Sequence, residues 1–496
     1  MDSIEAVNCQ NLIGGQWVPA ESGSTSENRC PADTDQFLGT APDSASVDVE
    51  QAVAAAKAAQ GPWAATPAPT RGDIILEVTR VLRRRGDELA RALSLEEGKI
   101  LPEAKGEVQK TLKYLEFAAG DARRITGITA ESELPGTFAF TMWRPHGVVG
   151  LITPWNFPVC IPLWKIAPAL ITGNAVVLKP APETPLTAHI IGEILAEAGV
   201  PDGVVNIVYG DVEPAQALLK HPDVHAISFT GSTEVGRIIE RTCGELHKPV
   251  QCELGGKNPI IVMDDADLEL AAAATAKGAF GSTGQRCTAT SRAIVHNAVA
   301  DEFVARVVEA AQAVQAGHPL HPDTTMGPSV SERQMEQVLR YHAIAESDGA
   351  KRLIGGGRLT DGDLARGYFP APSVYDHAAA DSRIATEEIF GPFLTVIRVD
   401  TLDEAIQAAN AVDFGLTSAV FTQSLSNAFA CVQGLDTGMT QVNAPTIGGE
   451  GHLPFGGIKA TGVGPREMGP DAWKFYAELK TVYINHASAK RTSNFY

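Results

Sequence analysis

The sequence has few cysteines, and their arrangement excludes two kinds of protein. They stand far apart, at positions 9, 30, 160, 243, 252, 287 and 431. An odd number with no Cys-x-x-Cys pair argues against a disulfide framework and against a zinc ribbon. We therefore expect no metal site and a reducing, cytoplasmic setting, where most of these thiols are small buried groups and a catalytic thiol would stay usable.

Long apolar runs and excess positive charge are also missing. No window holds the ~20 uninterrupted apolar residues of a membrane-spanning helix, and the most apolar stretch, 148–170, is interrupted by prolines and by Lys165. The net charge is −19, whereas nucleic acids and anionic membranes bind basic surfaces. The first residues lack the charged-then-apolar order of a signal peptide. We expect neither a nucleic-acid nor a membrane partner.

Two kinds of apolar periodicity are present instead. Residues 48–120 are predicted to be helical, because apolar residues recur at intervals of three and four. After Gly147, strands alternate with helices, the strands being expected at 148–152, 175–178, 204–208, 226–229 and 250–253. A second series follows Gly255, with strands at 260–263, 293–295, 394–399, 418–421 and 440–442. The alternation predicts an α/β fold of two doubly wound parallel sheets with a ligand cleft between them.

The segment Gly281-Ser-Thr-Gly-Gln-Arg-Cys287 is the strongest local signal for chemistry. Small residues let the backbone turn sharply before the cysteine, and a thiolate is a strong nucleophile toward a carbonyl. A buried cysteine in a glycine-rich loop is an equally good interpretation of this segment alone.

Two other segments offer groups that such chemistry needs. Glu253 ends a predicted strand before a Gly-Gly turn, where a buried carboxylate can activate water. Asn156 stands between Pro154 and Pro158, where its amide can be held rigidly to donate to an oxyanion. Taken singly, a surface glutamate and a turn-capping asparagine are the simpler interpretations.

Three segments suit a dinucleotide. Gly231, Ser232 and Gly236 open a helix after a strand, and a helix N-terminus binds phosphate. Lys179 ends a strand where open α/β sheets bind ligands, and Glu388 with Phe390 offers a carboxylate for a ribose and a ring for packing. A tight turn, a solvated lysine and a charged loop are the alternatives for each alone.

In this order the segments resemble the aldehyde dehydrogenase superfamily over nearly the whole chain, from Ile13-Gly-Gly-Gln-Trp17 to Lys480-Thr-Val-Tyr483. The resemblance implies that Cys287 is the nucleophile and forms a thiohemiacetal and then a thioester. Glu253 would activate the hydrolytic water, and Asn156 with the backbone N–H of Cys287 would form the oxyanion hole.

The resemblance further implies NAD or NADP as cofactor and a supporting role for Lys165 behind the site. The cofactor cleft would be lined by Trp155, Lys179, Gly231, Ser232, Gly236, Glu388 and Phe390. In many members that prefer NAD, an acid stands three residues after the lysine, and here that position is Pro182. Because no carboxylate at that position repels a 2′-phosphate, we expect either cofactor.

The segment Asn443–Glu467 is similar to the subgroup that acts on 2-oxoglutarate semialdehyde (2,5-dioxopentanoate). This similarity implies a small semialdehyde acid as substrate, surrounded by Phe157, Trp164, Arg286 and Lys110. A carboxylate of the substrate would pair with one of the two cations. A structural salt bridge of Arg286 and a solvated position of Lys110 remain open as alternatives.

Domain roles and competing functions also follow from the resemblance. Residues 1–121 and 146–254 would bind the dinucleotide, 255–462 would carry the nucleophile, and 122–145 with 470–496 would join subunits into a homodimer or homotetramer. The lone strand Thr481–Ile484 is expected to pair with another subunit. An acyl-CoA-forming dehydrogenase and a non-catalytic binding or structural protein are the competing functions, although Glu253 disfavours the first and the retained Cys287 and Glu253 disfavour the second.

Overall fold

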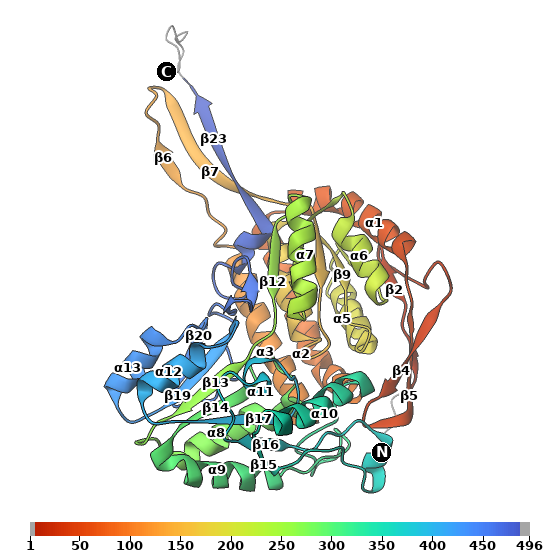
Figure 1. Ribbon diagram of the computed structural model, residues 1–496. Coiled ribbons are helices and arrows are strands. Elements are labelled where there is room, and N and C mark those ends of the chain that lie inside the picture. Colours follow the sequence, from red (N-terminus) through yellow and green to blue (C-terminus); the bar gives the residue numbers. More distant parts are fainter. Residues whose placement is uncertain (1–4, 487–496) are drawn as a thin grey trace.

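Two large sheets organise residues 5–486, the part of the chain that the computed structural model describes (Figure 1). The first has the order β22-β12-β11-β8-β9-β10-β2-β3. Its parallel centre consists of β12 (Val250–Glu253), β11 (Val224–Thr230), β8 (Val148–Ile152), β9 (Ala175–Lys179) and β10 (Val205–Ile207). At its edges β22 (Gly462–Val463), β2 (Asn11–Ile13) and β3 (Gln16–Val18) run antiparallel to their neighbours.

Helices cover both faces of this sheet, which explains why its central strands are apolar throughout. One face packs against α2 (Ala68–Glu97), α3 (Leu101–Asp121), α4 (Cys160–Thr172) and α5 (Pro185–Glu197). The other face packs against α1 (Ser46–Ala65), α6 (Val212–Lys220) and α7 (Thr233–Glu245). Every residue of β8 and β9 is buried as a result.

The second sheet has the order β15-β16-β17-β14-β13-β19-β20. Its strands are β13 (Asn258–Val262), β14 (Thr290–His296), β15 (Lys351–Ile354), β16 (Ser373–Asp376), β17 (Phe393–Val399), β19 (Thr417–Phe421) and β20 (Met439–Val442), and only β15 is antiparallel. One face carries α8 (Leu268–Phe280) and α9 (Asn297–Gln312). The other carries α10 (Glu332–Ser347), α11 (Arg383–Thr386), α12 (Leu402–Asn410) and α13 (Leu425–Gly434).

Shorter elements complete the described chain. A small sheet near the N-terminus contains β1 (Val7–Asn8), β4 (Thr25–Cys30) and β5 (Asp33–Pro42), and β18 (Phe414–Gly415) pairs with β21 (Ile458–Lys459). Single 3-10 turns lie at η1 (Gly281–Gly284), η2 (Gly362–Arg366) and η3 (Ala472–Tyr476). Within residues 5–486 no helix is long and apolar enough to cross a membrane.

A third sheet projects from the body (Figure 1) and corrects one prediction. It consists of β6 (Thr129–Glu131), β7 (Thr137–Pro145) and β23 (Ala477–Asn485). The expected lone strand is β23, but it pairs with β7 of its own chain, from Ala477 opposite Pro145 to Asn485 opposite Thr137. The nine-residue β7 offers it a complete antiparallel partner. Residues 487–496 of the predicted oligomerisation segment lie outside the described residues.

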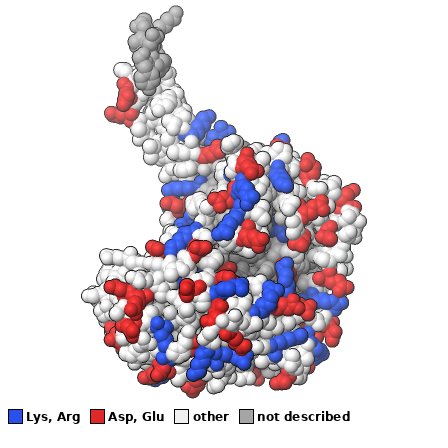
Figure 2. Space-filling view, viewed as in Figure 1, with Lys and Arg blue, Asp and Glu red and all other residues white. Residues whose placement is uncertain are grey.

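The prediction of an α/β fold with two doubly wound sheets is confirmed, with one correction. Both sheets are mixed, because short antiparallel strands close their edges. The surface is hollowed between the two lobes that the sheets form, and Lys and Arg side chains stand on its lower rim (Figure 2).

Candidate active site

The carboxyl edge of the first sheet gathers polar side chains from neighbouring strands. Thr230 at the end of β11 lies opposite Glu253 at the end of β12, and Ile152 at the end of β8 lies opposite Lys179 at the end of β9. Thr153 follows β8 directly. These side chains therefore stand in a row at the edge where open α/β sheets bind their ligands.

Several polar atoms of this row are buried without a partner. Thr153 Oγ1, Thr230 Oγ1 and Glu253 Oε2 make no hydrogen bond to any residue of the described chain. Because buried polar groups in proteins are nearly always hydrogen-bonded, three such atoms on adjacent strands indicate a place for a polar ligand or water.

Helix α7 begins at the same edge. Its N-cap Ser232 accepts a hydrogen bond from the Val235 N–H, and the Gly231 N–H donates to the Glu253 carbonyl at 3.1 Å. A Cβ at Gly236 would come within 2.3 Å of the Leu254 side chain, so glycine lets the helix pack closely against this end of the strand. The positive end of this 13-residue helix is therefore available for a phosphate group.

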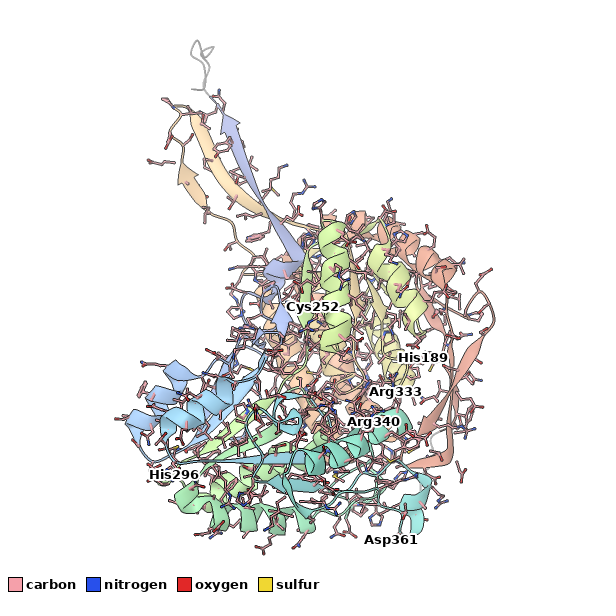
Figure 3. All side chains as sticks on the ribbon, viewed as in Figure 1. His189, Cys252, His296, Arg333, Arg340 and Asp361 are labelled. Atoms are coloured by element: carbon pink, nitrogen blue, oxygen red, sulfur yellow. The ribbon has the colours of Figure 1, made fainter. Side chains whose placement is uncertain are left out.

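Lys179 is buried beside α6. Its Nζ donates to the carbonyls of Gly210 at 3.2 Å and Asp211 at 3.4 Å, and burial lowers its pKa to about 8. Nearby Glu183 pairs at 3.3 Å with Arg333 of α10, which reaches across from the second lobe (Figure 3). Pro182, which lies three residues after Lys179, brings no carboxylate to this place.

The second lobe contributes Glu388 and Phe390 from the loop before β17. Glu388 Oε1 accepts from the Gly256 N–H at 2.8 Å, and burial raises the pKa of this carboxyl to about 7. Phe390 has a left-handed backbone, φ 60°, and its ring meets that of Trp155 edge-on at 5.5 Å. A cavity of about 750 Å³ continues from Glu388 along α7, which is within the roughly 300–1,000 Å³ typical of ligand pockets.

Cys287 follows a turn with strained backbone. Ser282, Thr283 and Gly284 have φ values of 49°, 56° and 67°, so the chain reverses sharply after α8. The Asn258 amide holds the Cys287 carbonyl at 2.8 Å. All seven cysteines are described, and Cys287 is the one that is not fully buried.

The structure brings Asn156 to the Cys287 loop. The Asn156 Nδ2 donates to the Gln285 carbonyl at 3.1 Å, two residues before the thiol, and the side chain is buried. An amide donor and a thiol that are far apart in the sequence therefore lie in one place.

Burial raises the pKa values of both Glu253 and Cys287. Burial raises the pKa of Glu253 well above its usual range, and the neighbouring Glu467 raises it further, against the opposing charge of Lys165. Burial also raises the pKa of Cys287 to about 12, and the carboxyls of Glu388 and Glu253 add to this while Lys110 opposes it. A positive charge bound beside the thiol would lower its pKa and favour the thiolate.

Lys165 lies behind Cys287, Asn156 and Glu253 rather than among them. It is fully buried on α4, and its Nζ donates to Ser228 Oγ at 2.8 Å and to Glu467. Ser228 in turn donates to Gln251 of β12 at 2.9 Å. Lys165 is thus linked through Ser228 to β12, the strand that carries Glu253.

Aromatic rings surround an amine that has no carboxylate partner in the described part of the chain. The Nζ of Lys110 lies 5.7 Å from the ring centres of both Trp164 and Phe455, which are 5.5 Å apart. Within the described residues no carboxylate pairs with Lys110. Phe157 packs against the same core cluster as these two rings, and its ring centre lies 4.1 Å from the Nζ of Lys99.

Arg286 forms the structural salt bridge that was the alternative to substrate binding. It pairs with Glu103 at 2.9 Å and donates to Ser282 Oγ at 2.7 Å, and its side chain is 15% exposed. Because these partners occupy its guanidinium, we do not assign Arg286 to the substrate, and Lys110 is the cation that remains.

The sequence prediction missed residues that hold these loops. Lys99 and Glu107 form a buried pair at 2.6 Å, and Glu467 accepts from Lys165. A signal was present for Glu107, which falls on the apolar face of its helix with Ala104, Val108 and Thr111. A charged residue on a buried face is expected to have a partner, and that expectation identifies it.

Comparison with known proteins places the chain. A sequence model of the Aldehyde dehydrogenase family matches residues 17–482. An alpha-ketoglutaric semialdehyde dehydrogenase of Bacillus subtilis (strain 168) is 41% identical, over 96% of this chain and 97% of that protein. A 2,5-dioxopentanoate dehydrogenase of Saccharolobus solfataricus is 41% identical over 95% and 98%. The solved structure of 3,6-anhydro-L-galactose dehydrogenase in complex with NAP superposes with a TM-score of 0.93 at 36% identity, covering 97% and 100%.

The chain belongs to the aldehyde dehydrogenase family. It is an enzyme that oxidises aldehydes with NAD or NADP. The resemblance to the semialdehyde subgroup, predicted from Asn443–Glu467, is confirmed by these relatives.

Proposed function

We propose that this enzyme oxidises a small semialdehyde acid of the 2-oxoglutarate semialdehyde (2,5-dioxopentanoate) type and releases the free dicarboxylic acid. The names of its relatives support the substrate class. The observation that carries the proposal is the unpaired Lys110 beside the rings of Trp164 and Phe455, near enough to Cys287 to oppose the rise in the pKa of the thiol. A substrate carboxylate held there would direct the aldehyde toward the thiol.

The proposed chemistry begins at Cys287. Its thiolate adds to the aldehyde carbon, and the Asn156 amide and the Cys287 N–H donate to the resulting oxyanion. A nicotinamide held by Glu388 would supply the acceptor for the hydride that leaves this carbon, and a thioester would remain on Cys287. Glu253 then accepts a proton from water as the water attacks the thioester, and the acid leaves as the thiol is restored.

The cofactor would lie along the carboxyl edge of the first sheet. The buried amine of Lys179 would hold the adenosine ribose, the N-terminus of α7 at Ser232 the pyrophosphate, and Glu388 the nicotinamide ribose. The partnerless Thr153 and Thr230 hydroxyls fit a polar ligand at this edge. Trp155 and Phe390 would close the cleft between the lobes.

An assay of substrate and cofactor tests this function. The absorbance of reduced nicotinamide is followed over aldehydes of matched length, with and without an ω-carboxylate, with NAD or NADP, and with and without coenzyme A. We expect the highest kcat/KM for the semialdehyde acid, free acid as product, and no dependence on coenzyme A. Product formed only as the coenzyme A thioester would instead favour the acyl-transferring alternative, which a retained Glu253 disfavours.

Substitution of Lys110 should change substrate choice. Lys110→Met should raise the KM for the semialdehyde acid about 10- to 100-fold, the size of a lost charge-assisted hydrogen bond. For a neutral aldehyde of equal length, KM should change less than about twofold, because that substrate has no charge to hold.

The control is Lys113→Met, an exposed lysine on the same helix. It removes the same charge from α3 without altering the approach to the thiol, and should leave both KM values as they were. Equal increases of KM for the acid and the neutral aldehyde in Lys110→Met would contradict the assignment.

We also propose that the enzyme is a homo-oligomer, a dimer or tetramer, joined through the projecting sheet. Phe138, Met142, Leu479, Tyr483 and Ile484 are exposed there by 43–69%. β23 and β20 leave open edges on the third and second sheets, and exposed apolar edges in native proteins are usually covered. Sedimentation at micromolar concentration should give at least a dimer, and Leu479→Glu should weaken it, whereas a monomeric wild-type enzyme would contradict the proposal.

The domain roles and the cellular setting remain proposals of the same kind. Residues 1–121 and 146–254 would form the cofactor domain, 255–462 the domain of the nucleophile, and 122–145 with 470–486 the subunit contact. A cytoplasmic location is supported by seven free cysteines. Fractionation of cells that finds the enzyme outside the cytoplasm would contradict it.

A further inference from the structure

Helix α3 carries two carboxylates one turn apart that the proposed chemistry does not use. They are Glu103 and Glu107, whose side chains are 20% and 1% exposed. Residues four apart on a helix share one face. Here each contacts a different loop of the active site.

Glu107 holds the loop of Asn156. Its Oε1 accepts from the Val159 and Cys160 N–H groups at 2.9 and 3.0 Å, where α4 begins. Its Oε2 accepts from Lys99 Nζ at 2.6 Å, and the same amine donates to the Asn156 carbonyl at 2.8 Å. The backbone is therefore held at Asn156 itself and three residues beyond it.

Glu103 holds the loop of Cys287. Its Oε1 accepts from the Ser282 N–H and from Arg286 Nη2, both at 2.9 Å. Arg286 closes the group by donating to Ser282 Oγ. Ser282 and Thr283 are in the left-handed region, a conformation that persists in such residues only when the surroundings impose it.

An oxyanion hole requires two donors to meet at one oxygen within a few tenths of an ångström. Under the function proposed above, one donor is the Asn156 amide and the other is the Cys287 N–H. We infer that α3 is the common anchor of both, so that Glu107 with Lys99, and Glu103 with Arg286, set the distance between the two donors. These four are positioning residues, and the inference rests on the proposed function.

A purely structural role predicts something different. A buried ion pair that served stability alone would, when broken, lower the amount of folded enzyme without acting specifically through Asn156. A positioning role makes the effect of Glu107 depend on the amide that it positions, and a double-mutant cycle measures this dependence.

The experiment compares Glu107→Gln in the wild-type enzyme and in Asn156→Ala. Alone, Glu107→Gln should lower kcat about 10- to 100-fold, as expected for a displaced donor, with KM changed less than about threefold. In the Asn156→Ala background the same change should lower kcat less than about threefold, because the positioned group is gone. Alkylation of Cys287 by iodoacetamide, which develops no oxyanion, should keep its rate in Glu107→Gln within about twofold.

Controls separate folding from positioning. Glu116→Gln, on the same helix, breaks an exposed pair with Arg83 and should leave kcat unchanged. If the charge left on Lys99 prevents Glu107→Gln from folding, Lys99→Met/Glu107→Gln removes both charges and should show the same dependence on Asn156. Unfolding midpoints are recorded for every variant.

Two outcomes would overturn the inference, and they are distinguishable. If Asn156→Ala strongly lowers kcat but Glu107→Gln lowers it equally in both backgrounds, α3 does not act through the oxyanion hole. If Asn156→Ala alone lowers kcat less than about threefold, the oxyanion assignment in the proposed function is wrong, and this inference fails with it.

Discussion

Replacement of Cys287 by alanine should lower kcat/KM for aldehyde oxidation by about 10⁴-fold or more, as loss of a covalent nucleophile does in other enzymes. In the proposed mechanism, hydride leaves the substrate carbon only after the thiol has made that carbon tetrahedral. Reduced nicotinamide formed in a stopped-flow mixing experiment gives the rate, and no burst should be visible.

A second buried cysteine provides the control. Cys431 is buried on α13 in the core of the second lobe, and the Cys431→Ala variant should keep its activity. If Cys287→Ala retained more than about a hundredth of the wild-type kcat, another group would have to be the nucleophile.

Replacement of Glu253 by glutamine should separate the two halves of the reaction. Hydride transfer does not need this carboxylate, so one reduced nicotinamide per active site should still form rapidly. Steady-state turnover should then fall about 10²- to 10⁴-fold, the usual contribution of a general base. The matched control is Glu245→Gln at the exposed end of α7, which should change neither phase.

The proposed role of Glu253 also predicts how turnover depends on pH. A general base works only when it is deprotonated, and burial raises the pKa of Glu253 well above its usual range. Where thioester hydrolysis limits turnover, kcat should therefore fall as the pH is lowered through this raised pKa, and Glu253→Gln should lose that dependence. A wild-type kcat that stays constant as the pH is lowered would contradict the assignment. So would loss of the burst in Glu253→Gln.

The sequence predicted the central strands because their residues are apolar on both faces. β8 and β12 have the predicted bounds, 148–152 and 250–253. The edges were missed for a physical reason: β2, β3 and β22 have only two or three residues each and pair antiparallel. Such short segments carry no periodic pattern, and only the completed fold brings β22 beside β12.

For the site residues too, local sequence was informative, whereas contacts formed only in the folded protein were not predictable. Cys287, Glu253 and Asn156 stand in distinctive local segments, so local chemistry and the family resemblance were enough to propose them. The choice between Arg286 and Lys110 was not available from the sequence, because it depends on Glu103, which lies 183 residues from Arg286 along the chain. The contacts of Glu107 with the Asn156 loop were equally out of reach, since helix α3 and α4 meet only in the folded protein.

The central claim is that Cys287, Asn156 and Glu253 act on one carbonyl. It is tested most directly by mixing Glu253→Gln with the semialdehyde acid and oxidised cofactor, quenching with acid, and mapping the protein by mass spectrometry. We predict one acyl group per active site, attached to the peptide that contains Cys287. The double variant Glu253→Gln/Asn156→Ala, quenched after the same reaction time, should carry none. An unmodified Cys287, or an acyl group on any other residue, would contradict the account.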